Sequence, residues 1–144
     1  MRALVLAFPV LLAAGVLGHA ATGPAKNAPV NPEVDICVKA AAAADHIKAD
    51  DVDKDACVCA TKELHLLLKP DDFDLHEKML TVIAGGADKN SFDKQMSDIM
   101  LKRGMKQPDV DAFLARSKKA ENAAQTKCNS SPLLNPQPLS PIKP

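Results

Sequence analysis

The chain has no tryptophan and no tyrosine, and its only aromatic side chains are four phenylalanines. Surfaces that stack on sugars or nucleic-acid bases depend on exposed aromatic rings, so this scarcity argues against both kinds of binding. The 18 basic residues are matched by 18 acidic ones, which leaves no net charge. A neutral balance gives no electrostatic reason to expect a nucleic acid or an anionic membrane as partner. We therefore expect a protein that binds no nucleic acid.

The longest apolar run extends from Ala3 to Leu17 and follows a single basic residue, Arg2. After it comes Gly18-His19-Ala20, which has small residues at the two positions that a signal peptidase recognises. This order is typical of a cleavable secretory signal. At about 15 residues the run is shorter than a helix that spans a bilayer. We predict that residues 1–20 are a signal peptide and that the protein is exported, either periplasmic or secreted. No transmembrane segment is expected after cleavage.

Composition divides the rest of the chain into three parts. Residues 21–30 are short, polar and proline-containing, and are interpreted as a flexible leader. Residues 129–144 hold five prolines, which remove backbone donors and predict a disordered or polyproline-like tail. Such a tail is either inert or a ligand for a partner domain. A helical domain is predicted between them, over residues 31–128.

Helical signals run through the whole of this domain. Asn31-Pro32-Glu33 combines an N-cap side chain, a proline at the first helical position and an acid near the helix start. The alanine run from Ala40 to Ala44 has thin side chains that let a second helix approach closely. Four further helices are predicted, from about residue 53 to 68, from Pro70 to Gly85, from a Ser91 cap to Gly104, and from Pro108 to Cys128. Together they predict an all-α fold, a small disulfide-bonded bundle of about five helices.

Four cysteines, Cys37, Cys57, Cys59 and Cys128, are the most informative residues of the domain. An even count in a small exported domain indicates structural disulfides. On one helix, Cys57 and Cys59 point roughly 200° apart, so each is expected to reach a different partner, Cys37 or Cys128. Which cysteine pairs with which stays open. The pairs Cys37–Cys57 and Cys59–Cys128 would close one short and one long loop, contributing about 3 to 4.5 kcal/mol each.

The Cys57-x-Cys59 spacing is also compatible with a redox or metal-binding function. Such a pair can cycle between dithiol and disulfide, or bind Cu(I) or Zn²⁺ with His65 or His76 completing the site. No strand–helix pattern of a thioredoxin-like unit surrounds it. We favour structural disulfides and predict no metal and no cofactor.

Asp51, Asp53 and Asp55 alternate as an EF-hand calcium loop begins. However, Ala56 stands where the turn needs glycine, and Lys62 stands where a bidentate acid must close the site. We interpret the segment as an acidic helix start.

The methionines Met96, Met100 and Met105 allow copper binding or an adaptable groove, but their helical spacing with Phe92 predicts core positions. No catalytic constellation is recognisable, so no catalytic residue is assigned and no enzymatic activity is expected.

Three functional hypotheses follow. The first is an exported, non-enzymatic helical binding or scaffold protein, stabilised by two disulfides, with an unidentified protein or hydrophobic ligand as partner. The second is a metal-handling or thiol-redox protein that uses the Cys-x-Cys pair. The third is a pH-responsive periplasmic chaperone, opened by protonation of carboxylates and of His46, His65 and His76. In size, helicity, export and disulfides the chain is similar to small helical periplasmic chaperones of acid stress.

Overall fold

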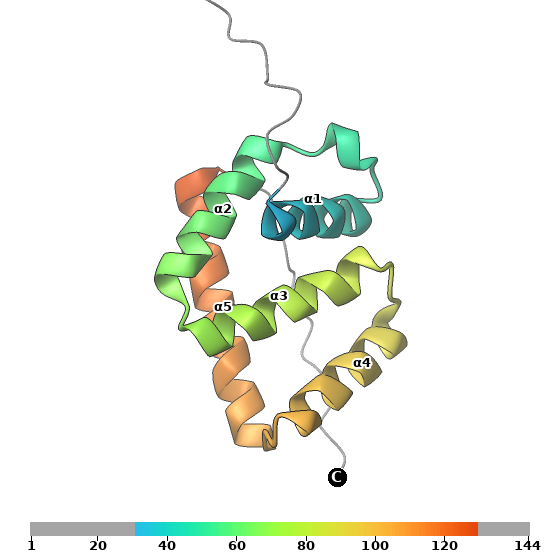
Figure 1. Cartoon of the computed structure of the whole chain (residues 1–144), viewed down its shortest axis with the longest axis vertical. Helices are drawn as coiled ribbons and strands as arrows, with labels where there is room; N and C mark the ends of the chain where they lie inside the picture. The colour runs from blue at the N-terminus through green and yellow to red at the C-terminus, as the bar shows by residue number, and fades with distance from the viewer. Residues whose placement is uncertain (1–30, 130–144) are drawn as a thin grey trace, which may run out of the picture.

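The computed structural model describes residues 31–129; the predicted signal peptide, the leader and all but the first residue of the predicted tail lie outside this range. Within it the chain is all-helical, with five α-helices, one short 3₁₀ helix and no strand, as the sequence predicts (Figure 1). In chain order the elements are α1 (Pro32–Asp45), η1 (Ala49–Asp51), α2 (Lys54–Leu67), α3 (Pro70–Ala84), α4 (Lys89–Lys102) and α5 (Gln107–Cys128).

The helix starts follow from local capping. Asn31 Oδ1 accepts the backbone N–H of Glu33 at 3.0 Å, and Asp53 caps α2 in the same way. The predicted cap at Ser91 is wrong. Asp88 caps α4 instead, because its Oδ1 accepts the Ser91 N–H at 2.8 Å and the helix begins about one turn earlier.

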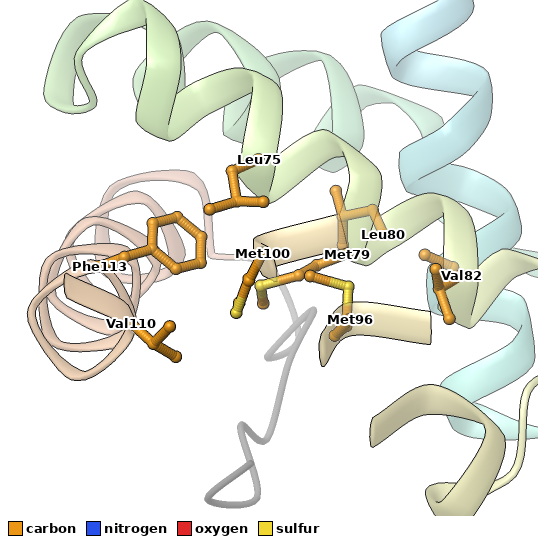
Figure 2. Packing of buried hydrophobic residues seen from close by; sticks show 9 residues of the cluster. Leu75, Met79, Leu80, Val82, Met96, Met100, Val110 and Phe113 are labelled. Carbon is orange, nitrogen blue, oxygen red and sulfur yellow. The ribbon is translucent and has the colours of Figure 1, made fainter. Parts of the chain in front are cut away.

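The main core lies where α3 packs between α1 and α4 and meets α5 (Figure 1). Figure 2 shows the side chains of α3, α4 and α5 converging there, with Met96 and Met100 facing α3. Both methionines are fully buried, and Met105 packs against the same cluster, which confirms their predicted core positions. Ala40 is also fully buried and belongs to this cluster, as expected if the alanine run lets another helix approach closely.

Two disulfides cross-link the helices. Cys37–Cys57 joins α1 to α2, and Cys59–Cys128 joins α2 to α5, with Cα–Cα distances of 5.8 and 5.7 Å. The first and last helices are thus both tied to the second. A smaller apolar cluster fills the space between α2, α3 and α5; it consists of Leu64, Leu68, Phe73, Ala120 and Ala124.

None of the helices over residues 31–129 is long and apolar enough to cross a membrane.

Candidate functional site

All four cysteines are engaged in the two disulfides, so neither Cys57 nor Cys59 is a free thiol. The two residues are divided between different bridges, as their opposite directions on one helix require. Metal binding or thiol exchange at Cys57 and Cys59 would first need both bridges to be reduced. Among residues 31–129, no group of three potential metal-binding side chains comes together.

The three histidines within residues 31–129 lie in three separate environments. His46 ends α1 in the left-handed conformation (φ 54°). His65 on α2 stacks on the Phe73 ring at a centroid distance of 3.7 Å, and its Nε2 lies 2.8 Å from Glu33 Oε2. His76 on α3 is only 1% exposed.

The acidic residues that resemble an EF-hand loop have other roles. Asp51 lies in η1. Asp53 Oδ1 accepts the N–H groups of Asp55 and Ala56 at 3.0 and 3.1 Å, so this side chain serves the start of α2.

A buried polar cluster connects α3 with α5. His76 Nδ1 is hydrogen-bonded to Ser117 Oγ at 2.8 Å and lies 3.4 Å from Glu121 Oε1. Ser117 and Glu121 are 2% and 8% exposed. His76 Nε2 and Glu121 Oε1 are buried without a hydrogen-bond partner in the described part of the chain. Two unsatisfied polar atoms in one core cluster are unusual in a native protein.

Burial controls the charge of this cluster. Desolvation lowers the pKa of His76 to about 4 and raises the pKa of Glu121 to about 8. Near pH 6 both side chains are therefore neutral, although they lie within ion-pair distance of each other. Desolvation therefore favours a proton on the Glu121 carboxyl group over a proton on the His76 ring.

The three residue types also occur in serine hydrolases, but the arrangement differs. In a catalytic triad the serine and the carboxylate contact opposite ring nitrogens of the histidine. Here Ser117 Oγ and Glu121 Oε1 both face Nδ1. The cluster therefore lacks the geometry of a catalytic triad, in which the histidine accepts the serine proton on one ring nitrogen and contacts the acid through the other.

His76 is recognisable in the sequence as a candidate site residue, whereas its partner Glu121 was not predicted. A signal for Glu121 was present, because Phe113, Ser117, Glu121 and Ala124 recur at helical spacing and all are buried on one side of α5. Two polar residues on an otherwise apolar stripe indicate a buried polar contact. The sequence does not show what faces them.

A shallow groove between α1 and α2 exposes apolar side chains to solvent. It encloses about 370 Å³, and its apolar wall is formed by Val34, Val58 and Leu66. Val58 is 52% and Leu66 70% exposed. Glu33, Lys62 and His65 supply the polar part of its lining. We call this feature the α1/α2 groove.

A second hollow, near the start of α3, is lined mostly by charged groups. Asp72 and Asp74 form part of it, and both are paired. Arg116 donates two hydrogen bonds of 2.8 Å to Asp72, while Lys78 and Arg103 contact Asp74. These cations hold the pKa of both carboxyl groups below its usual range. The hollow therefore carries little unpaired charge for a ligand.

No family model, curated protein or solved structure matches this chain. The candidate sites therefore rest on the geometry described above.

Proposed function

We propose that this protein is a non-enzymatic binding module that works after export and holds an extended, aliphatic polypeptide segment in the α1/α2 groove. The main support for this proposal is that Val58 and Leu66, both more than half exposed, lie with Val34 around one hollow. Exposed apolar side chains gathered in one hollow and rimmed by polar groups are a feature of protein-interaction sites.

The groove walls are held by covalent and polar contacts. Cys37 lies one turn after Val34, and its partner Cys57 directly precedes Val58, so this disulfide fixes the spacing of the two walls. The contact between Glu33 and His65 joins the same two helices farther along. A pre-organised site loses little conformational entropy when a ligand binds.

The lining also restricts the kind of ligand. Its residues include no phenylalanine, and the chain has no tryptophan or tyrosine, so sugar or base stacking is not supported. Val34, Val58 and Leu66 suit aliphatic side chains, while Lys62 and Glu33 offer one charge of each sign to a polypeptide. Export is supported by the disulfides, which persist in oxidising compartments.

The pH-responsive alternative receives little support from the buried pair. In the folded state His76 and Glu121 together hold one proton between about pH 4 and pH 8. With ordinary pKa values, the same two groups in the unfolded chain also hold one proton between about pH 4.5 and 6.5. Because the folded and unfolded states bind the same number of protons at these two groups, lowering the pH within this range does not favour unfolding through this pair.

The binding proposal is tested by NMR titration of ¹⁵N-labelled residues 21–144, disulfides intact, with a panel of short aliphatic peptides. We expect shifts at Val34, Val58 and Leu66. Leu66→Asp should abolish binding. Leu101→Asp, at a 42% exposed leucine on α4, is the matched control and should bind as the wild type does. Equal binding by both variants, or no binding by the wild type, contradicts the proposal.

A further inference from the structure

Three side chains of the α1/α2 groove form a stripe along α2. Val58, Lys62 and Leu66 follow one another at four-residue intervals, and all three are exposed. In an α-helix this interval corresponds to a rise of about 6 Å and a rotation of about 40° around the axis. The stripe therefore places one cation between two aliphatic side chains.

Lys62 carries the unpaired charge of this groove. Among residues 31–129 its ammonium group forms no ion pair. The acidic residue of the lining, Glu33, already contacts His65, with 2.8 Å between Oε2 and Nε2. Glu33 also lies in the first turn of α1, where a carboxylate stabilises the positive end of the helix dipole. A ligand therefore meets a positive charge that is not neutralised by the groove itself.

An extended polypeptide matches the spacing of the stripe. Alternate side chains of an extended chain point to the same side, and every second residue advances the chain by about 6.6 Å. A segment with an aliphatic, an acidic and an aliphatic residue at positions i, i+2 and i+4 can therefore place its carboxylate against Lys62. Its aliphatic side chains then lie over Val58 and Leu66. An acid at i+1 or i+3 points away from the stripe.

We propose that the α1/α2 groove selects extended segments in which an acidic residue has an aliphatic residue two positions away on each side. The inference rests on the proposed function, because it names the class of segment that the groove holds. A fatty acid also combines a carboxylate with an aliphatic chain. However, Val58 and Leu66 are more than half exposed, so the groove would leave much of an acyl chain in water, unlike a small-molecule site.

The test compares capped peptides by NMR titration of residues 21–144, disulfides intact. Three peptides carry leucine at i and i+4 and differ at i+2, which is aspartate, asparagine or lysine; a fourth has asparagine at i+2 and its aspartate at i+1. The first should bind about two- to fivefold more tightly than the asparagine peptide, the range of an exposed ion pair. The lysine peptide should bind most weakly, and the fourth peptide should bind as the asparagine peptide does. Salt at about 0.5 M should remove the advantage of the acid.

Substitutions at Lys62 assign the preference to this side chain. Lys62→Glu should reverse the order, so that the lysine peptide binds more tightly than the aspartate peptide. Lys62→Gln should bind the aspartate and asparagine peptides equally, and it provides the same test if the charge reversal disturbs the fold. Lys94→Glu, at an exposed lysine on α4, is the matched control and should keep the wild-type order.

The outcomes separate this inference from the proposed function. Equal affinity of the wild type for the aspartate and asparagine peptides overturns the selectivity and leaves the binding function standing. So does an advantage that persists in Lys62→Gln, or an equal advantage for the acid at i+1. If no peptide binds the wild type, both are wrong. Binding of decanoate without peptide binding, or groove shifts that grow with protein concentration alone, overturns the proposal in favour of an acyl ligand or a second copy.

Discussion

The substitution Glu121→Gln tests the charge state of the buried cluster. Glutamine has nearly the shape of a protonated glutamate and cannot ionise. Because burial raises the pKa of Glu121 to about 8, its carboxyl group is protonated in the folded wild type at neutral pH. The variant should therefore fold normally and differ from the wild type mainly in how its stability changes with pH.

The direction follows from proton counts in the folded and unfolded states. The folded pKa of Glu121 lies above the ordinary value of 4.5, so its contribution to stability is complete below pH 4.5 and is lost as pH rises towards 8. His76 has a lowered folded pKa, so its contribution is complete above pH 6.5 and is lost as pH falls towards 4. In the wild type the two trends cancel between about pH 4.5 and 6.5.

The magnitude follows from the size of the shifts. At about 1.4 kcal/mol per pH unit, the wild type should lose about 2 kcal/mol of unfolding free energy between pH 6.5 and 8. Glu121→Gln should show no such loss and should instead lose about 3 kcal/mol between pH 6.5 and 4, through His76. The difference between the two proteins should change by about 4 kcal/mol from pH 5 to pH 8.

Guanidinium unfolding at a series of pH values measures these curves. Far-ultraviolet circular dichroism is the suitable signal, because the chain has no tryptophan or tyrosine to report by fluorescence. Disulfides stay oxidised throughout. Asp98→Asn, at an exposed carboxylate on α4, is the control and should retain the wild-type decline above pH 6.5. Parallel curves for wild type and Glu121→Gln would refute the charge assignment of the buried pair.

Two further predictions concern stability. Replacing Cys59 and Cys128 by serine should lower the unfolding free energy by about 4 kcal/mol, and replacing Cys37 and Cys57 by serine should lower it by about 3 kcal/mol, because the two disulfides close loops of 69 and 20 residues. Urea unfolding of each double variant measures these losses, and a larger loss for the shorter loop would contradict the prediction. Phe113→Ala should cost about 3 to 5 kcal/mol in the same assay, since this ring is fully buried in the main core, and a loss under 1 kcal/mol would show that the core is packed differently.

Much of the fold was predictable because its signals are local. Capping side chains, prolines at first helical positions and glycines after the last turn act within a few residues, so the five helices could be placed from the chain alone. The error at Ser91 has the same origin. Asp88 and Ser91 are both good N-cap residues three positions apart, and only the hydrogen bond between them shows which one begins α4.

The candidate sites were less predictable because each joins distant segments. His76 and Ser117 are 41 residues apart in sequence, and their contact depends on how α5 packs against α3. The α1/α2 groove likewise exists only because α1 lies against α2 with Val58 and Leu66 left uncovered. Helical periodicity shows that a residue faces inward, but it does not show which residue it meets.

The cysteines show the same division. The sequence alone determined that Cys57 and Cys59 would point to different partners, because the helix rotates about 100° per residue. It left two pairings open. The tertiary structure decided for Cys37–Cys57 and Cys59–Cys128, since the chain order of α1, α2 and α5 does not by itself determine which helix lies on which side of α2. Local geometry sets the direction of a side chain, and only the packing of whole helices decides its partner.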